Sequence, residues 1–280
     1  MHKRSHAITA HCLIRNEENW IWYAINSIID YVDTILVFDT GSTDRTVEIV
    51  KSIKSPKIIF EEKGIVDKKQ YTTLRQEMLD RTDTQWFLIL DGDEVWPKAT
   101  IEELVVAMNN SPKEKDAVVV GQWVCMGDIF HYSKPLERYE HSQYPGMKGF
   151  RLPRAIRKIK GLHGIGLYGF ESYADKNGLN ISYWDMKRLI FIKNKFFHMT
   201  LLPRSSSRKK DREVMMRSQK TFFYKGASFP KKLKYPEVFY RKHPTIVPSP
   251  WRKLTFLDQV KGIYYRIQNF KERFLIQKYP

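Results

Sequence analysis

Cysteine is scarce in this chain of 280 residues, which contains only Cys12 and Cys125. The two are far apart and neither belongs to a CxxC pair, so the spacing indicates neither a zinc site nor a framework of disulfides. Both lie among apolar residues, where buried free thiols are expected, and free thiols are typical of a reducing compartment. We therefore expect a cytoplasmic protein without structural disulfides.

Long apolar runs are absent as well. No stretch of about 18 uncharged apolar residues occurs, so the sequence predicts no transmembrane helix. Residues 1–9 carry positive charge, but no apolar core follows them, so a secretory signal is not expected. No internal repeat is visible. With 42% hydrophobic and 14% aromatic residues, the chain is long enough for one large or two small globular cores.

Acidic residues are few in the last part of the chain. Residues 1–100 contain 13 basic and 16 acidic side chains, residues 101–200 contain 15 and 10, and residues 201–280 contain 20 and 5. Nearly all of the net charge of +17 therefore belongs to the last segment. Such a basic region attracts the phosphates of lipids, nucleic acids or a substrate. The alternative is a cationic surface that serves only solubility.

Patterns of strands and helices alternate over about the first 125 residues. Short apolar runs predict strands at 7–14, 34–38, 57–60, 86–90 and 117–123. Apolar residues spaced three or four positions apart predict helices at 16–31, 43–53, 68–79 and 100–109. Two of these helices begin with capping-box patterns, Asp67 with Gln70 and Thr100 with Glu103. The alternation predicts an α/β fold with a mainly parallel sheet covered by helices.

The periodicity is weaker in the second half. Residues 128–183 mix glycine, aromatic and basic residues, which predicts loops and short antiparallel strands, and residues 189–199 predict a further strand. A serine- and lysine-rich stretch at 205–210 is typical of a mobile loop or linker, and the proline-rich span 230–250 excludes a long helix. From Leu254 to Phe274, apolar residues recur every three or four positions among basic ones, which predicts a basic amphipathic helix.

Two apolar runs end abruptly in aspartate. Residues 35–38 are followed by Asp39, and residues 86–90 are followed by Asp91 and, after one glycine, Asp93. A continuous apolar run is typical of a strand buried on both faces, and ligands collect at the carboxyl ends of such strands. Two carboxylates separated by one glycine can share a hard cation, since Mg²⁺ prefers one or two carboxylates together with substrate phosphate oxygens. Such a cation would neutralise a departing diphosphate.

The Asp91–Asp93 turn has other interpretations. It is alternatively a solvated acidic turn, or a turn that caps the helix after it. A calcium-binding EF-hand is excluded, because Trp96 occupies the sixth position, where glycine is required.

The turn at Asp39 also has two interpretations. Residues 37–42, VFDTGS, resemble the active-site segment of an aspartic protease, but such an enzyme needs a second, facing aspartate, and no second D-T/S-G occurs. The segment that follows has a helical pattern. It therefore favours a strand–turn–helix unit whose amides face an anionic or nucleoside ligand, or a helix-capping turn in which Asp39 is satisfied locally.

Four segments together resemble glycosyltransferase family 2. The family pattern is roughly a strand ending in KNEE, then VVDSGSTDRT, then ARN, then LDADE. The corresponding segments here, in the same order and with similar spacing, are IRNEE at 14–18, VFDTGSTDRT at 37–46, LRQ at 74–76 and LILDGDE at 88–94. The likeness covers about residues 7–110 and is nearest to bacterial lipopolysaccharide-core glucosyltransferases. Gln76 replaces the usual asparagine, and Arg15 replaces the commoner lysine.

This resemblance implies a GT-A type fold with a Rossmann-like sheet and helices on both faces. It implies a nucleotide-diphosphate sugar as donor, inversion at the transferred sugar, and a hydroxyl of a saccharide or lipid-linked acceptor as the receiving group. Asp39 would contact the nucleobase or its ribose, and Arg75 and Arg15 would lie near the nucleotide. Asp91 and Asp93 would hold Mg²⁺ or Mn²⁺ against the diphosphate.

Inverting transfer also needs a base that takes a proton from the acceptor hydroxyl. Relatives often carry a His-Glu pair in the region where this chain has Glu171 and His163, so both are candidates and Glu171 is preferred. Glu94 and Asp128 are rivals, and each of these side chains can equally be an ordinary polar residue. His198 lies where many GT-A enzymes bring a late histidine toward the metal, so it is a candidate third ligand.

The resemblance divides the chain into three parts: a nucleotide-sugar-binding half at 1–125, an acceptor-side part at 126–203, and a basic extension at 204–280. At the start of this extension lie Arg204, Arg208 and Lys209, which can fold over the diphosphate and exclude water, or form a solvated linker.

Other functions and contacts stay open. A nucleotidyltransferase of related fold would usually show a Gly-rich, basic first loop, whereas residues 16–18 are acidic here. A non-enzymatic nucleic-acid binder would explain the basic region but leaves Asp91 and Asp93 unexplained, so no nucleic-acid partner is expected. The 254–274 helix is predicted to pack on the catalytic domain. The alternative is peripheral contact with the anionic inner face of a membrane.

Overall fold

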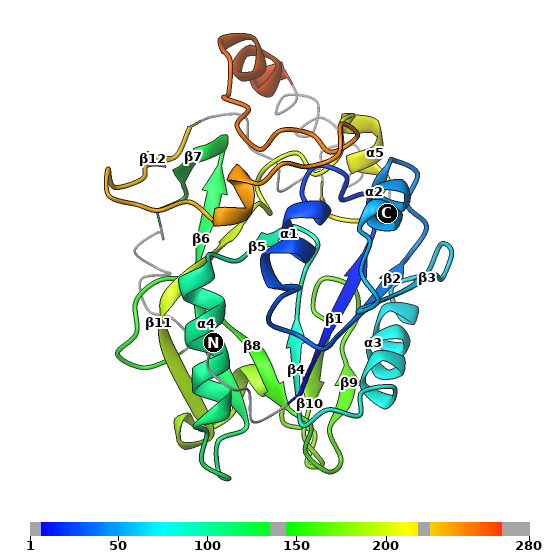
Figure 1. Ribbon diagram of the computed structural model, residues 1–280, viewed down its shortest axis with the longest axis vertical. Helices are drawn as coiled ribbons and strands as arrows, with labels where there is room; N and C mark the ends of the chain where they lie inside the picture. Colours follow the sequence, from blue (N-terminus) through cyan, green and yellow to red (C-terminus); the bar gives the residue numbers. More distant parts are fainter. Residues whose placement is uncertain (1–6, 135–143, 218–224, 265–280) are drawn as a thin grey trace, which may run out of the picture.

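The computed structural model describes residues 7–134, 144–217 and 225–264 (Figure 1). Its centre is a large sheet whose strands follow the order β12-β7-β6-β8-β4-β1-β2-β3, with β11 beside β6 and β5 beside β11. The strands of this sheet are β1 Ile8–Ile14, β2 Thr34–Asp39, β3 Ile58–Glu62, β4 Trp86–Ile89, β5 Glu94–Val95, β6 Ala117–Met126, β7 Asp128–Tyr132, β8 Arg151–Arg157, β11 Leu189–His198 and β12 Ala227–Ser228.

The first half of the sheet is parallel. Strands β3, β2, β1 and β4 are neighbours and run in the same direction, with Ile14 of β1 opposite Asp39 of β2. All seven residues of β1 are buried, as expected for a strand covered on both faces. The α/β architecture predicted from the alternating patterns is confirmed, and so are the five strands predicted before residue 125.

The second half of the sheet is mixed. Strand β8 runs antiparallel between β4 and β6, while β11 runs parallel to β6 and antiparallel to β5. The sequence predicted only short antiparallel strands in this region, and β8 is longer than expected because Pro153–Ile156 are buried in the sheet. A separate hairpin, β9 His163–Ile165 with β10 Ser172–Ala174, lies beside it.

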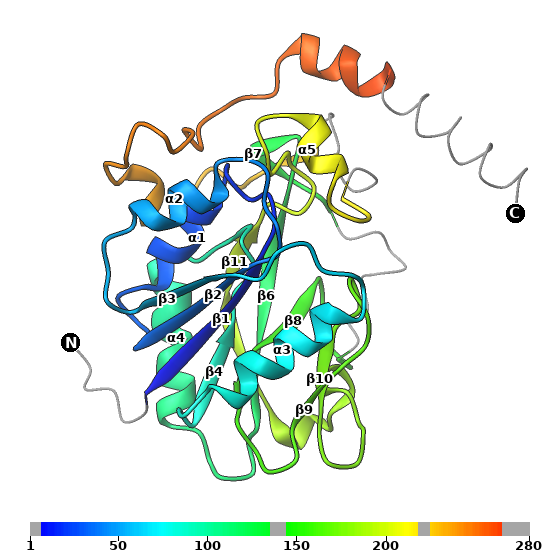
Figure 2. The same ribbon diagram turned by 90° about the vertical axis from the view of Figure 1, so that its right-hand side faces the viewer.

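Helices cover both faces of the sheet (Figure 2). Helices α1 Ile21–Ile28, α2 Thr46–Ser52 and α4 Lys98–Asn109 lie on one face, and α3 Gln70–Asp80 lies on the other. The predicted helix at 16–31 is shorter than expected at both ends. Its first residues form a turn, in which Asn16 has a φ of 53° and its side chain binds the turn after β2.

The two predicted capping boxes have different outcomes. Asp67 and Gln70 exchange hydrogen bonds, because Oε1 of Gln70 accepts from the Asp67 amide at 2.7 Å and Oδ1 of Asp67 accepts from the Gln70 amide at 2.9 Å. The box at Thr100 and Glu103 is wrong: α4 begins at Lys98, after Pro97. Both side chains instead bind the backbone of β11, so a tertiary contact replaces the predicted cap.

The chain after β11 returns to the elements formed by the first half of the sequence and packs against them. The predicted loop at 205–210 contains a short helix, α5 Arg208–Arg212, and the proline-rich span contains a 3-10 helix, η4 Glu237–Tyr240. Phe239 of η4 packs edge-to-face on Tyr23 of α1. Two further 3-10 helices precede β11, η2 Ile181–Tyr183 and η3 Met186–Arg188.

Residues 256–264 form the described part of the predicted amphipathic helix, and Figure 2 shows that it projects from the body. Its apolar side chains are exposed, namely Phe256, Leu257, Val260, Ile263 and Tyr264. The expectation that this stripe packs on the catalytic domain is therefore wrong over 256–264, and residues 265–280 lie outside the described part.

Two predictions from composition can be compared with the structure. Cys12 and Cys125 are buried and free, as expected. In the part of the chain that the structure describes, no helix is long and apolar enough to cross a membrane.

Candidate active site

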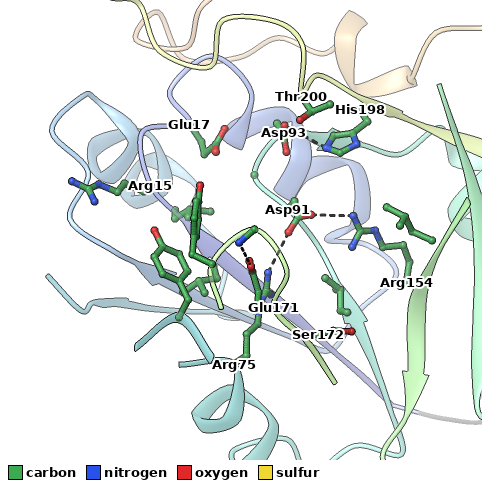
Figure 3. Close-up of a pocket in the computed structure, with 18 of the residues that line it drawn as sticks. Arg15, Glu17, Arg75, Asp91, Asp93, Arg154, Glu171, Ser172, His198 and Thr200 are labelled. Atoms are coloured by element: carbon green, nitrogen blue, oxygen red, sulfur yellow. Dashed lines mark hydrogen bonds and ion pairs between the residues drawn. The ribbon is translucent and has the colours of Figure 1, made fainter. Parts of the chain in front are cut away.

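A cavity of about 330 Å³ lies at the carboxyl ends of β1 and β4 (Figure 3). It is bordered by the turns after these strands, by α3 and β8, by the segment before and within β10, and by the chain that follows β11. Strands β1 and β4 are apolar and buried, and they end where polar residues begin, so their turns bring charged groups to one edge of the sheet.

Asp91 and Asp93 follow β4 and both line this cavity. Asp91 is held by two arginines: its Oδ1 lies 3.3 Å from Nη2 of Arg75, and its Oδ2 lies 3.0 Å from Nη2 of Arg154. Burial alone would raise the pKa of Asp91, but Arg154 and Arg75 outweigh it and lower that pKa. The pKa of Asp93 is lowered too, because Arg204 and His198 outweigh its burial. Both aspartates are therefore ionised at neutral pH.

The imidazole of His198, at the end of β11, faces Asp93. Its Nδ1 lies 2.6 Å from Oε1 of Gln122, and its Nε2 lies 3.5 Å from Oδ2 of Asp93. Because an amide oxygen only accepts, Nδ1 carries the hydrogen of this contact, and Nε2 is directed at the carboxylate. Burial lowers the pKa of His198, but Asp93 outweighs it, and the pKa is raised overall.

Arg154 of β8 is a site residue that the sequence reasoning missed. Its guanidinium group is buried, binds Asp91, and makes a short ion pair with Glu94, whose side chain is fully buried. Burial raises the pKa of Glu94 to about 7. An arginine between apolar residues of a strand was the available signal, because a buried charge requires a partner.

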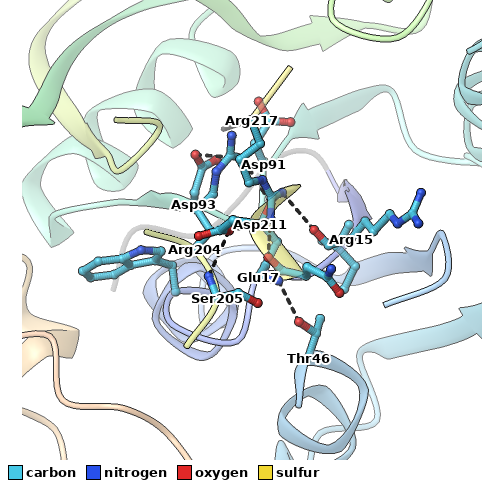
Figure 4. A network of polar contacts seen from close by, with 12 residues as sticks. Arg15, Glu17, Thr46, Asp91, Asp93, Arg204, Ser205, Asp211 and Arg217 are labelled. Carbon is cyan, nitrogen blue, oxygen red and sulfur yellow. Dashed lines mark hydrogen bonds and ion pairs between the residues drawn. The ribbon is translucent and has the colours of Figure 1, made fainter. Parts of the chain in front are cut away.

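Arg204 and Arg217, from the chain after β11, contact the acidic side chains of the early half (Figure 4). Arg204 Nη1 is 3.1 Å from both Oδ2 of Asp93 and Oε1 of Glu17, and Arg217 Nη2 is 2.5 Å from the same Glu17 oxygen. Burial raises the pKa of Glu17 to about 8 in spite of both arginines. A protonated carboxyl group still accepts hydrogen bonds, so the contacts do not depend on that proton.

The site residues fit a divalent cation in their chemistry. Neither carboxylate oxygen of the buried Asp93 has a hydrogen-bond partner among the described residues, although its Oδ2 forms ion pairs with His198 and Arg204. Carboxylate oxygens and an imidazole nitrogen are suitable ligands, and the hydrogen bond to Gln122 resembles the outer contacts that orient ligating histidines. No group of three His, Cys, Asp or Glu side chains within the described ranges is already arranged around a metal position.

The candidate bases are placed differently. Glu171 lines the cavity, and its Oε2 accepts a hydrogen bond from the Gly169 amide at 2.5 Å. His163 is not among the described residues that border this cavity, and its Nδ1 lies 3.1 Å from the carbonyl of Gly161. Glu94 is buried behind Arg154. Asp128 binds His131 and lines a different cavity.

Of the three residues expected near the nucleotide, Arg15 and Arg75 line the cavity, and Asp39 is not among the residues that border it. Asp39 is buried, and its carboxylate accepts hydrogen bonds from the Gly41 and Ser42 amides at 3.1 and 2.9 Å and from the Ser42 hydroxyl. In this conformation Asp39 is satisfied by its own turn, which is the local alternative considered from the sequence.

Comparison with known proteins bears on the whole arrangement. Residues 13–168 match glycosyl transferase family 2. An uncharacterised glycosyltransferase of Rickettsia bellii is 32% identical over 97 residues, which are 35% of this chain and 31% of that protein. The SPbeta prophage-derived glycosyltransferase SunS of Bacillus subtilis is 30% identical over 91 residues, 32% of this chain and 21% of SunS. The matched part thus spans a third or less of these curated relatives.

Solved structures give weaker similarities. Residues 1–349 of S. aureus TarS, in complex with UDP-GlcNAc, match with a TM-score of 0.46 and 15% identity, over 77% of this chain and 67% of that one. Glucosyl-3-phosphoglycerate synthase of Mycobacterium tuberculosis, with Mn²⁺, UDP-glucose and phosphoglyceric acid, matches with a TM-score of 0.44 and 14% identity, over 69% of this chain and 72% of that one.

Proposed function

This chain belongs to glycosyl transferase family 2 and is a glycosyltransferase, and from this premise we propose that it moves a sugar, with inversion, from a nucleotide-diphosphate sugar to a hydroxyl of a saccharide or lipid-linked acceptor. The observation that carries the proposal is the Asp91–Asp93 turn at the end of a buried parallel strand, in a cavity that five arginines border. Carboxylates that serve only structure would not need a cavity beside them.

We propose that Asp91, Asp93 and His198 hold Mg²⁺ or Mn²⁺. A bound cation would supply positive charge for the departing diphosphate. Five carboxyl groups face four guanidinium groups here, namely Glu17, Asp91, Asp93, Glu94 and Asp211 with Arg75, Arg154, Arg204 and Arg217. Because burial raises the pKa of Glu17 to about 8 and that of Glu94 to about 7, carboxylate charge does not exceed guanidinium charge at neutral pH. The arginines can therefore compensate an anionic ligand, while Asp91 and Asp93 stay ionised for a cation.

The nucleotide would occupy the side of the cavity formed by β1 and α3. Arg15 and Arg75 border that side and would compensate phosphate charge. Asp39 would contact the nucleobase or ribose after its carboxylate exchanges one of its local hydrogen bonds for the ligand. Tyr71 and Tyr168, whose rings lie 4.4 Å apart near this side, offer aromatic surface for the nucleoside.

Glu171 would accept the proton of the acceptor hydroxyl. It lines the same cavity as the Asp91–Asp93 turn, is only half-buried, and has one oxygen outside the contact with Gly169. A base in this place would receive the proton as the hydroxyl attacks the sugar, which is the geometry that inversion needs. His163 stays the second candidate.

We also propose a separate role for each of three segments of the chain. Residues 1–125 would bind the nucleotide sugar, 126–203 would contribute the acceptor side, and 204–280 would form a basic extension. The exposed apolar face at 256–264, close to the basic Arg252, Lys253 and Lys261, favours peripheral contact with an anionic membrane surface in the cytoplasm. That location suits a lipid-linked acceptor.

A panel of nucleotide sugars tests the proposal directly. Purified protein is incubated with Mn²⁺ and UDP-, GDP-, CDP-, ADP- and dTDP-sugars, and nucleotide release is measured. We expect slow, metal-dependent release from one donor class. Release from none of them, or release that excess EDTA leaves unchanged, would contradict the proposal. Pyrophosphate release from nucleoside triphosphates would favour the nucleotidyltransferase alternative.

A further inference from the structure

The chain after β11 crosses the nucleotide side of the site. Residues 203–217, here called the strap, lie against the turns that follow β1 and β2. Nδ2 of Asn16 donates to the carbonyl of Lys210 at 2.8 Å, and the hydroxyl of Thr43 donates to Glu213 at 2.5 Å. The strap therefore contacts two of the segments that resemble the family pattern, although these contacts span 170 to 201 residues of sequence.

Arg217 fastens the end of the strap. Its side chain is only 2% exposed. Nη1 donates to the carbonyl of Asn16, and Nη2 donates to the carbonyl of Arg15 at 2.8 Å and to Oε1 of Glu17 at 2.5 Å. One guanidinium group thus binds three consecutive residues of the turn after β1, which fixes the orientation of that turn.

Glu17 links Arg217 to Arg204, because it contacts both guanidinium groups. The same carboxylate oxygen that binds Arg217 lies 3.1 Å from Nη1 of Arg204, and that nitrogen is also 3.1 Å from Oδ2 of Asp93 (Figure 4). Arg204 borders the cavity at the point where Asp93 lies. Its neighbour Pro203 is fixed as well, because Nε1 of Trp20 donates to the Pro203 carbonyl at 2.9 Å.

We propose that Arg217 is a positioning residue for the donor's diphosphate: through Glu17 and the turn after β1, it holds the guanidinium group of Arg204 where that group binds the diphosphate. This inference rests on the proposed donor class. Arg217 borders the cavity, but both its Nη1 and Nη2 already bind the turn after β1, so the role assigned to it acts through that turn. We expect its effect on the phosphate that Arg204 reaches and not on the nucleoside, for which Asp39, Tyr71 and Tyr168 are the proposed contacts.

The test separates this role from a general contribution to folding. For the nucleoside diphosphate that binds most tightly in a UDP, GDP, CDP, ADP and dTDP panel, calorimetry with Mn²⁺ gives Kd for the diphosphate and for the matching monophosphate. The ratio of these constants measures the preference for the second phosphate. Loss of part of the folded population would weaken both ligands equally and leave the ratio unchanged.

The variants are Arg217→Lys, Arg204→Lys, the double variant and Glu17→Gln. Arg217→Lys keeps the charge but loses the forked contact, so we expect the diphosphate preference to fall by about tenfold. Arg204→Lys should lower it by at least as much, and the double variant should lower it no further than Arg204→Lys, because both act through one contact. Glu17→Gln should reproduce part of the loss. Arg212→Lys, an exposed arginine of the same strap, should leave the preference unchanged.

Two results would overturn the inference: an unchanged preference in Arg217→Lys, or additive losses in the double variant. If Arg217→Lys fails to fold, Glu17→Gln with and without Arg204→Lys gives the same cycle, and additivity there has the same meaning. Failure of the proposed function itself looks different, since the unmodified protein would then bind none of the diphosphates.

Discussion

The two parts of the chain contribute opposite charges to one cavity. The parallel half supplies carboxylates, with Glu17 after β1 and Asp91 and Asp93 after β4. The later part supplies cationic or proton-accepting nitrogen groups on β8, β11 and the strap, namely Arg154, His198, Arg204 and Arg217. The exceptions are Arg15 and Arg75 in the early half and Glu171 and Asp211 in the later part.

This difference shows how the site is stabilised. Glu17, Asp91, Asp93 and Glu94 each have at least one arginine partner from far along the chain. A buried charge without a partner costs several kcal/mol. Neither half forms the site alone. Substitutions on either side should therefore affect stability, and substitutions of the proposed metal ligands should in addition affect chemistry.

The largest expected effect is on the carboxylate side. Asp93→Asn keeps the shape of the side chain but removes the charge of a proposed metal ligand, so turnover should fall by about a thousandfold or more. Nucleotide release at saturating donor and Mn²⁺ measures it, and circular dichroism checks the fold. Asp83→Asn, an exposed aspartate in the turn before β4, is the matched control. Near-normal turnover in Asp93→Asn would show that the metal mechanism is wrong.

The proposed base comes next. Glu171→Gln should retain donor binding but lose transfer by about a hundredfold or more, because the amide cannot accept the acceptor's proton. Calorimetry measures the binding, and product formation with a saccharide acceptor measures the transfer. His163→Gln is the comparison variant and should remain near normal. The reverse outcome would assign the base to His163.

The regular elements of the early half were predictable from sequence, and β8 was not. Apolar runs such as those of β1 and β4 are local patterns, so they predict buried strands without knowledge of the rest of the fold. Strand β8 reads RLPRAIR, which contains a proline and three arginines and has no strand signal of its own. It is buried because it pairs with β4 on one side and β6 on the other, and there Arg154 meets Asp91 and Glu94, which lie about 60 residues earlier.

For the site, too, local patterns could be predicted from the sequence and contacts between distant residues could not. Asp91 and Asp93 could be proposed because a DGD turn after an apolar run is a local signal, supported by the resemblance to a family. Thr100 was misinterpreted because its local pattern fits a helix cap, while its hydroxyl in fact binds the carbonyl of Lys195 on β11. Arg217 has a local partner in Asp211, six residues earlier, but its contacts with the turn after β1 go to backbone carbonyls and a carboxylate about 200 residues away, so its role could not be predicted from the sequence.

Arg154 should matter for stability. Arg154→Met leaves Glu94 buried without a cation, which should cost about 3 kcal/mol in the free energy of unfolding. Urea denaturation measures this cost, and Arg154→Met with Glu94→Gln should recover part of it. An unchanged unfolding free energy in the single variant would show that the buried pair does not stabilise the fold.

The pH dependence of this pair has a defined sign. Because the pKa of Glu94 is raised from 4.5 to about 7, the folded protein holds an extra proton between these values, and Glu94 lowers the stability as the pH rises through that window. Arg154→Met raises this pKa further and extends the loss above pH 7. Urea midpoints measured across the window should therefore diverge most on the alkaline side.

A smaller effect is expected in the pH dependence of the affinity for the metal. The raised pKa of His198 means that a proton competes with the metal for Nε2. Below that pKa, the apparent affinity for Mn²⁺ should fall by about tenfold per pH unit, one proton being released for each metal bound. Titration of Mn²⁺ at several pH values measures the slope. His198→Gln should bind Mn²⁺ more weakly and with a flatter pH dependence, and an unchanged slope would exclude His198 as a ligand.

The smallest effect concerns the exposed helix at 256–264, which belongs to neither half of the site. Its side chains Leu257 and Ile263 are 67% and 63% exposed, so Leu257→Ser with Ile263→Ser should leave the unfolding free energy almost unchanged. The same change should weaken sedimentation with anionic vesicles by roughly tenfold at low salt, because apolar side chains immersed in the interface contribute about 1 kcal/mol or more each.

Val106→Ser, at an apolar residue exposed on α4, is the control. Equal binding of all three proteins would assign the membrane contact to basic residues elsewhere, and binding by none would exclude that contact. A fall in stability in the double variant would instead show that the helix packs on the protein in solution.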